Sequence, residues 1–356
     1  MSKQLNDKNL AVLDCTSNFE RYAHVESSLI YSSLEEPPYI SIIIPTYRRA
    51  DLLKEALDSA INQTNFTDYE IIVLDNDHLI DCATDALLKE YTETHRRIAY
   101  YRNSENIGLY GNWNRSIEIS RTNWFCLLHD DDLLLPQYLF EIVSLLNNYS
   151  NEDIALWGNM SFFFENSKNL ASSSKNNGNI EKEMFTKLIR NPFFLSPSDI
   201  LRQVTLSATA LVINQSYSME LGGFDERFYP PSDIAFFAKA AIYKKIATTP
   251  KFLSLRRLSV NTLRNTAVHE SVFRVYYDLL KNIFVAQDLR NNMLVEISMV
   301  TLLYNLKKYN PNIDTNLLKE YHLHPFWTNC PNFILKILQA FFWLWAAKKT
   351  VKPHSK

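Results

Sequence analysis

The stretch that decides the fold is Leu127-Leu128-His129-Asp130-Asp131-Asp132-Leu133-Leu134-Leu135-Pro136. An apolar run that begins at Trp124 leads into three consecutive aspartates, and a second apolar run follows them at once. An ionised carboxylate that is buried without a partner costs several kcal/mol, whereas the flanking residues favour burial. A buried strand whose C-terminal end delivers the aspartates into a cleft satisfies both demands, and ligands bind at that edge of open α/β sheets.

Three carboxylates at a strand end suit a hard divalent cation such as Mg²⁺ or Mn²⁺, which takes oxygen ligands and often accompanies phosphates. The alternative is structural: an acidic turn that caps a helix starting near Pro136. A single aspartate favours the cap. Three in succession after an apolar strand favour the metal site.

Composition limits the classes of protein that remain. The chain has 356 residues, of which 46% are hydrophobic and 13% aromatic, so it can build a sizeable core in one large α/β domain with an appendage, or in two domains. A net charge of −2 argues against a nucleic-acid partner. The polar N-terminus predicts no export signal, and no apolar run reaches the roughly 20 residues of a membrane span. The scattered cysteines, which predict reduced thiols in a cytoplasmic protein, are Cys15, Cys82, Cys126 and Cys330.

Strand and helix patterns alternate through the first half of the chain. Pro37-Pro38 marks a boundary after an N-terminal extension, residues 1–38. Continuously apolar stretches at 39–45, 69–74 and 97–102 predict buried strands, and apolar spacing predicts helices after each. This alternation indicates an α/β fold with a mostly parallel sheet flanked by helices. Polar residues follow each strand, so we expect one cleft to be lined by Thr46, Asp75, Asn106 and Asp130–Asp132.

The second half of the chain predicts further strands at 154 and 207–214. The turn Gly222-Gly223 precedes a helix that runs to about Tyr243, for which Asp233 is the natural N-cap. Helical spacing from about Val268 onward predicts a helical C-terminal region, residues 266–356.

Four motifs occur together in one order. They are Ser41-Ile42-Ile43-Ile44-Pro45-Thr46-Tyr47-Arg48-Arg49, Glu70-Ile71-Ile72-Val73-Leu74-Asp75-Asn76-Asp77, Leu128-His129-Asp130-Asp131-Asp132, and Gly222-Gly223-Phe224-Asp225-Glu226 followed by Ser232-Asp233. With these motifs the chain resembles the inverting family 2 glycosyltransferases, which have the nucleotide-diphosphosugar transferase (GT-A) fold. The resemblance implies a GT-A domain over residues 39–265.

The resemblance also implies roles for individual residues. The donor, a nucleotide-diphosphosugar such as a UDP-sugar, is expected to contact Pro45, Thr46, Asp75, Asn106, Gly108 and Asp130. Asp131 and Asp132 are expected to hold Mn²⁺ or Mg²⁺, and Asp233 to deprotonate the acceptor hydroxyl with inversion at the sugar. A metal offsets charge that develops on the diphosphate, and a base in reach of the hydroxyl typically contributes about 10²–10⁴-fold.

Three positions depart from the family pattern. His129 occupies the place of the first acidic residue of the metal motif, so either Asp130 and Asp132 form the pair in a shifted register or His129 replaces the ribose-contacting carboxylate. Ser232 stands where an acidic residue usually precedes the base. Arg257 lies where many relatives supply a metal-binding histidine, and the nearest histidine, His269, is expected to be a partly exposed helix residue.

Residues 332–350 form an apolar, aromatic segment followed by lysines. As a helix its apolar part is about 23 Å long, shorter than the ~30 Å hydrocarbon core. Its aromatic residues and flanking lysines predict an amphipathic helix that lies in an anionic membrane surface; the alternative is a terminal helix packed on the protein. A peripheral position on the inner face of the cell membrane agrees with a lipid-linked acceptor.

These patterns favour a hexosyl- or N-acetylhexosaminyltransferase that acts on a saccharide acceptor, lipid-linked, in bacterial surface polysaccharide (lipopolysaccharide O-antigen or capsule) biosynthesis. A catalytically degenerate nucleotide-binding scaffold subunit is the first alternative. A nucleotidyltransferase is the second, although Thr46–Arg49 lacks the glycine-rich phosphate loop that such chemistry usually needs.

Overall fold

The structure is a computed structural model that describes residues 17–165 except 33 and 81, residues 191–258 except 198, 200–205 and 207, residues 266–281 and 289–309, and scattered positions from 313 to 338. Its strands are β1 (Ser27–Ser32), β2 (Ile40–Thr46), β3 (Tyr69–Asp75), β4 (Ile98–Asn103), β5 (Trp124–Leu127), β6 (Leu133–Leu134), β7 (Ile154–Phe164), β8 (Phe193–Leu195), β9 (Leu211–Asn214) and β10 (Lys245–Arg257). Its helices are η1 (Glu20–Tyr22), α2 (Ala50–Ile61), α3 (Ala83–Thr94), α4 (Gly108–Ile119), α5 (Tyr138–Asn148), α9 (Gln215–Glu220), η3 (Glu226–Phe228), α10 (Ser232–Tyr243), α11 (Thr266–Leu280) and α12 (Leu289–Tyr309).

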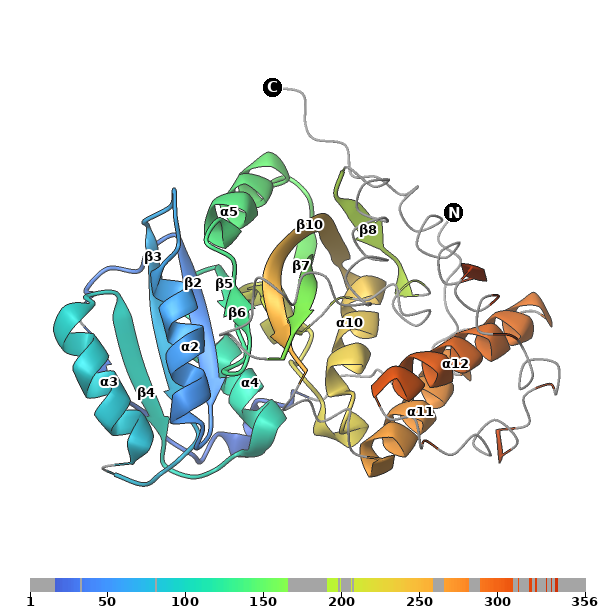
Figure 1. The fold of residues 1–356 in the computed structure, drawn as a ribbon, viewed down its shortest axis with the longest axis horizontal. Coiled ribbons are helices and arrows are strands. Elements are labelled where there is room, and N and C mark those ends of the chain that lie inside the picture. The colour runs from blue at the N-terminus through green and yellow to red at the C-terminus, as the bar shows by residue number, and fades with distance from the viewer. Residues whose placement is uncertain are drawn as a thin grey trace.

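Within the described residues the strands form one sheet, in the order β1-β4-β3-β2-β5-β9-β7-β10-β6, with β8 paired to β10 (Figure 1). Strands β4, β3, β2 and β5 run parallel, and β7 and β10 are also parallel to each other. The register pairs Thr46 with Asp75 and Asp75 with Arg102, so these strands end at one level. The predicted α/β architecture, a mostly parallel sheet flanked by helices, is confirmed.

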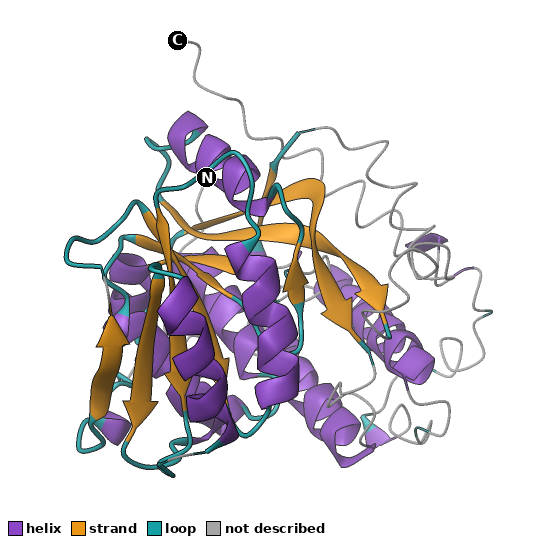
Figure 2. Cartoon of the chain, turned by 60° about the vertical axis from the view of Figure 1, so that its left-hand side comes forward, coloured by secondary structure: helices purple, strands orange, loops and turns teal. Residues whose placement is uncertain are grey.

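Helices cover both faces of the sheet (Figure 2). All seven residues of β2 are buried, because successive side chains point to opposite faces and both faces are covered. Ile42 and Ile44 belong to a core cluster that includes residues of α2, α3 and α5, whereas Ile43 belongs to the cluster that includes residues of α4, α10, α11 and α12. The two cores therefore hold the strand ends rigidly.

The N-terminal segment corrects one expected boundary. Residues 1–38 were expected to form an extension outside the domain, but β1 pairs antiparallel with β4 and extends the sheet. Before β1, Asn18 Nδ2 donates to the Gly222 carbonyl at 2.9 Å, and Tyr22 donates to Glu226 at 3.1 Å. β1 covers strand β4, which would otherwise be the edge of the sheet. Together with the contacts of Asn18 and Tyr22, this pairing makes residues 17–32 part of the packed domain.

The C-terminal region is described only in part. The helices α11 and α12 agree with the prediction of a helical region, but His269 on α11 is fully buried, not partly exposed as expected. The predicted amphipathic helix at 332–350 lies outside the described residues apart from 334, 337 and 338. Among the described helices none combines the length and apolarity required to cross a membrane.

A buried ion pair at the amino-terminal end of β3 tests this packing. Arg121 donates to Glu70, whose side chain is fully buried on β3. We expect Arg121→Ala to lower the free energy of unfolding by about 3–5 kcal/mol in urea denaturation, because it leaves a buried charge uncompensated. Arg21→Ala is the control: Arg21 is 58% exposed and lies 3.3 Å from Glu226, so about 0–1 kcal/mol is expected. Equal losses in the two variants would contradict the prediction.

Candidate active site

The carboxyl ends of β2, β3 and β5 meet as the sequence predicts. Thr46 ends β2, and its hydroxyl donates to Asp130 Oδ2 at 2.8 Å. The backbone amide of Asn76, just after β3, donates to the Thr46 carbonyl at 2.9 Å. Pro45 precedes Thr46 within β2 and is buried. The predicted donor-binding residues Pro45, Thr46, Asp75 and Asp130 therefore gather at one edge.

Asp75 is fully buried at the end of β3. Its carboxylate accepts hydrogen bonds from the Asp77 amide at 3.0 Å and from the Tyr100 hydroxyl at 3.3 Å. Burial raises the pKa of Asp75 to about 6, although these hydrogen bonds oppose the rise. A buried carboxyl group with unused hydrogen-bonding capacity is suited to binding polar groups of a ligand.

A network of buried amides fixes the loop that precedes α4. Asn76 Nδ2 donates to Asn106 Oδ1 at 2.9 Å and to the Gly108 carbonyl at 3.1 Å, and Asn103 donates to Asn76 Oδ1 at 3.0 Å. Gly108 has φ +74°, a left-handed conformation that favours glycine. Asn106 Oδ1 also accepts from the Gly108 amide at 2.9 Å. The predicted residues Asn106 and Gly108 thus lie beside Asp75, with the Asn106 side chain holding the loop.

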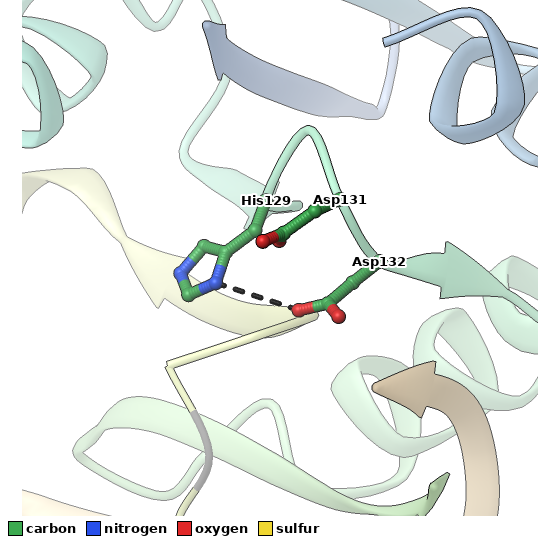
Figure 3. Close-up of side chains that lie close together, drawn as sticks. All are labelled: His129, Asp131 and Asp132. Atoms are coloured by element: carbon green, nitrogen blue, oxygen red, sulfur yellow. Dashed lines mark ion pairs between the residues drawn. The ribbon is translucent and has the colours of Figure 1, made fainter. Parts of the chain in front are cut away.

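The turn after β5 gathers His129, Asp131 and Asp132, whose possible ligand atoms all lie within 4.8 Å of one another (Figure 3). His129 Nδ1 faces Asp132 Oδ2 at 3.5 Å and the Thr209 hydroxyl at 3.0 Å, and Thr209 also donates to Asp132. Among the described residues no partner reaches the buried Nε2 atom of His129. One imidazole nitrogen and two carboxylates are a donor set that fits Mn²⁺ and related divalent ions. Asp130 turns away from this cluster, toward Thr46.

The pKa values of Asp131 and Asp132 shift in opposite directions because their partners differ. Burial, reinforced by the adjacent carboxylate of Asp132, raises the pKa of Asp131 to about 6. Burial also acts on Asp132, but its hydrogen bond to His129 and the charge of that ring prevail and lower its pKa. Against the effect of burial, the same pair raises the pKa of His129. Asp132 is therefore the ionised anchor of the cluster, and Asp131 is the carboxylate that gains most from a cation.

Two arginines tie the acidic turn to its neighbours. Arg49, in the loop after β2, places Nη1 3.3 Å from Asp130 Oδ1 and 3.5 Å from Asp131 Oδ2. Arg257, at the end of β10, donates its amide to Asp132 Oδ1 at 2.7 Å and its Nε to the Asp131 carbonyl at 3.0 Å. Arg257 therefore holds Asp131 and Asp132 in place, in the region where the family resemblance led us to look for a metal-binding histidine.

Asp233 lies at the start of α10 and is partly exposed. It was expected to be the N-cap of this helix, but the helix begins at Ser232, so Asp233 lies in the first turn and accepts from the Ile234 amide at 2.9 Å. Burial raises its pKa, and the positive charges of Arg256 and His129 oppose this rise. Asp233 is therefore close enough to His129 and Arg256 for their charges to affect its pKa.

Aromatic residues of α4 join these parts. Sequence reasoning missed them, because aromatic residues at helical spacing usually belong to the hydrophobic core. The ring of Trp113 stacks on His129 with centroids 4.8 Å apart. Tyr110 is buried, and its hydroxyl donates to the Pro230 carbonyl just before α10. Thr209 was also missed, since a single threonine within the strand predicted at 207–214 carries no motif.

Residues 41–206 match the family model described as Glycosyl transferase family 2. This segment is a family 2 glycosyltransferase domain. The match includes Thr46, Asp75 and the acidic turn, while Asp233 lies beyond it.

Similar sequences agree with this assignment. The domain is 27% identical over 172 residues to an uncharacterized glycosyltransferase of Methanocaldococcus jannaschii, covering 48% of this chain and 58% of that protein. It is 30% identical over 194 residues to the GalNAc(5)-diNAcBac-PP-undecaprenol beta-1,3-glucosyltransferase of Campylobacter jejuni, covering 54% of this chain and 56% of that protein. The chain therefore matches less than two thirds of the length of either relative.

Similar solved structures have the GT-A fold. Staphylococcus aureus TarS (residues 1–349) in complex with UDP superposes with a TM-score of 0.53 at 12% identity, over 87% of this chain and 90% of that one. The mannosyltransferase PcManGT of Pyrobaculum calidifontis, in complex with GDP-Man and Mn²⁺, gives a TM-score of 0.51 at 13% identity, over 96% and 94%. The predicted GT-A fold is thereby confirmed.

The raised pKa of Asp75 has a consequence for stability. Its folded pKa, about 6, exceeds the ordinary value of about 3.9, so its contribution is fully present below pH ~4 and is lost as the pH rises through 6. Asp75→Asn keeps an acceptor for the Asp77 amide and removes the charge. We expect it to raise the free energy of unfolding at pH 7 by about 2 kcal/mol and to flatten the pH dependence of stability between 4 and 6.

Urea denaturation at several pH values measures this effect. Asp68→Asn, at an exposed residue just before β3, is the matched control and should change little. Loss of stability in Asp75→Asn at pH 7 would show instead that the fold depends on the charged carboxylate.

Proposed function

We propose that this chain transfers a hexose or N-acetylhexosamine from a nucleotide-diphosphosugar, a UDP-sugar, to a saccharide acceptor, with inversion. The observation that carries the proposal is the meeting of Thr46, Asp75, the His129–Asp132 turn and the first turn of α10 at one sheet edge. The family 2 domain and the nucleotide- or nucleotide-sugar-bound GT-A structures support it.

The donor would lie across the ends of β2, β3 and β4. Asp75, whose carboxyl group is already buried, would accept hydrogen bonds from the base. Pro45, Thr46 and the loop that carries Asn106 and Gly108 would contact the rest of the nucleoside. Thr46 and Arg49 hold the carboxylate of Asp130 at the same edge. There Asp130 would contact the ribose or the diphosphate of the donor.

A divalent ion, Mn²⁺ or Mg²⁺, would be held by Asp131 and Asp132, with His129 as a third ligand. When bound, such an ion neutralises charge on the diphosphate leaving group, which is worth several kcal/mol. Thr209 and the Arg257 amide orient Asp132, and Trp113 orients the His129 ring, so the ligands are held before the donor arrives. This preorganisation avoids reordering side chains during the reaction.

Asp233 would remove the proton of the acceptor hydroxyl as that oxygen attacks the anomeric carbon from the side opposite the diphosphate. The bond from this carbon to the diphosphate oxygen breaks as the new glycosidic bond forms, which gives inversion. Burial raises the pKa of Asp233, and a stronger carboxylate base takes the proton more readily.

The acceptor in this proposal is a lipid-linked saccharide, in bacterial surface polysaccharide biosynthesis such as that of O-antigen or capsule. The Campylobacter jejuni relative, whose name gives it an undecaprenol-linked substrate, supports this choice. A peripheral position at the inner face of the cell membrane, through residues 332–350, would bring the site to such an acceptor.

Nucleotide release tests the donor and the metal together. With UDP-, GDP- and dTDP-sugars and Mn²⁺ or Mg²⁺, we expect slow hydrolysis of one donor, which EDTA abolishes and Asp131→Ala lowers by at least about 10²-fold, because several kcal/mol of charge stabilisation is lost. Asp68→Ala, which alters an exposed carboxylate at the opposite edge of the sheet, should release nucleotide at the wild-type rate. Release that is unaffected by both EDTA and Asp131→Ala would refute the metal role.

The proposed base is tested by a substitution that removes the charge of Asp233 and keeps the shape of its side chain. Asp233→Asn should lower transfer by about 10²–10⁴-fold while the donor dissociation constant stays near the wild-type value, because the carboxylate acts on the acceptor only. Asp51→Asn is the matched control, since Asp51 is also the second residue of a helix, α2, and is exposed. Wild-type turnover in Asp233→Asn would exclude Asp233 as the base.

A further inference from the structure

Tyr229 presents a large apolar surface to water beside the start of α10. Its side chain is 57% exposed, and it stands between η3 and α10, four residues before Asp233. The other exposed tyrosine of this region, Tyr243, is 48% exposed and ends α10, so the length of the helix separates it from Asp233. An exposed aromatic ring near a candidate base is a candidate contact for whatever that base acts on.

The segment that carries Tyr229 is fixed from two sides. The Tyr229 amide donates to the Glu226 carbonyl at 3.0 Å, and the buried hydroxyl of Tyr110 donates to the carbonyl of Pro230. The Tyr110 ring also meets the Tyr229 ring edge to face, with centroids 6.3 Å apart at an interplanar angle of 79°. The ring is therefore held in place although Tyr229 is 57% exposed, and a surface ordered in advance costs less entropy when a ligand binds.

We propose that Tyr229 is a stacking platform for a sugar ring of the acceptor. The proposal rests on the function given above, since it takes Asp233 as the base. An acceptor whose hydroxyl lies within reach of Asp233 would extend over the first turn of α10. Tyr229 lies in the segment just before that turn.

The chemistry of the ring selects the class of acceptor. A pyranose has an apolar face of C–H groups and a rim of hydroxyls, so it can cover the aromatic face of Tyr229 and keep its hydroxyls in water, while the phenol group stays solvated. An acyclic polyol offers no such flat apolar face. The structure thus assigns a cyclic saccharide as the group next to the accepting hydroxyl.

The test uses the full chain with UDP and Mn²⁺, and methyl β-D-glucopyranoside, methyl β-D-galactopyranoside and methyl N-acetyl-β-D-glucosaminide as probes, with glycerol as the acyclic comparison. Saturation-transfer NMR titration gives a dissociation constant for each. We expect Tyr229→Ala to raise the constant of the tightest glycoside about tenfold, the factor that ~1.4 kcal/mol of lost contact produces. Tyr229→Phe should stay within about twofold of wild type, because the ring remains.

Tyr243→Ala is the matched control: it removes an exposed tyrosine from the same helix and should leave glycoside binding unchanged. Both alanine variants should melt at the wild-type temperature, which separates lost contact from lost folding. Equal glycoside binding by wild type and Tyr229→Ala would overturn the inference, as would a wild type that binds no glycoside better than glycerol.

Nucleotide release from the same samples keeps this inference distinct from the proposed function. If release depends on metal and on Asp131 but glycoside binding ignores Tyr229, the platform alone is refuted. If no donor is hydrolysed while glycoside binding depends on Tyr229, the surface binds saccharides and the transferase proposal fails.

Discussion

The cost of placing three adjacent carboxylates in a largely buried turn is the constraint on which the rest of this structure depends. The two buried aspartates, Asp130 and Asp132, are compensated from different parts of the fold. Thr46 from β2 and Arg49 from the following loop reach Asp130, while Asp132 is met by the Arg257 amide from β10 and by Thr209 before β9. The acidic turn is therefore held by contacts with strands that are distant from it in the sequence.

Asp131 is the exception that gives the turn its chemistry. It has the weakest compensation, a 3.5 Å approach of Arg49, and burial with the neighbouring Asp132 raises its pKa to about 6. A site that leaves one carboxylate short of positive charge has free energy to gain from a cation. In the proposed function that cation arrives with the donor diphosphate.

In the proposed function, helix α4 links the donor side of the site to the acceptor side. It begins at Gly108, in the loop that Asn76 holds, and its Trp113 stacks on His129. Its Tyr110 contacts the Pro230 carbonyl and the ring of Tyr229, immediately before the helix that carries Asp233. One helix thus contacts the loop of Asn76, the ring of His129 and the segment just before α10, which fixes the relative positions of these three parts.

The sequence by itself determined the mostly parallel sheet and the gathering of Thr46, Asp75 and the acidic turn at the carboxyl ends of its strands, because apolar runs and the polar residues that follow them are local patterns. Only the tertiary structure decided which aspartate faces which partner, that Asp233 lies inside its helix rather than at the cap, that His269 is buried and that β1 completes the sheet. It also brought Thr209, Arg257 and Tyr229 to the site. These outcomes depend on contacts between residues 80 to 200 positions apart in the chain, such as Thr209 with His129 and Arg257 with Glu55, and no local pattern encodes such contacts.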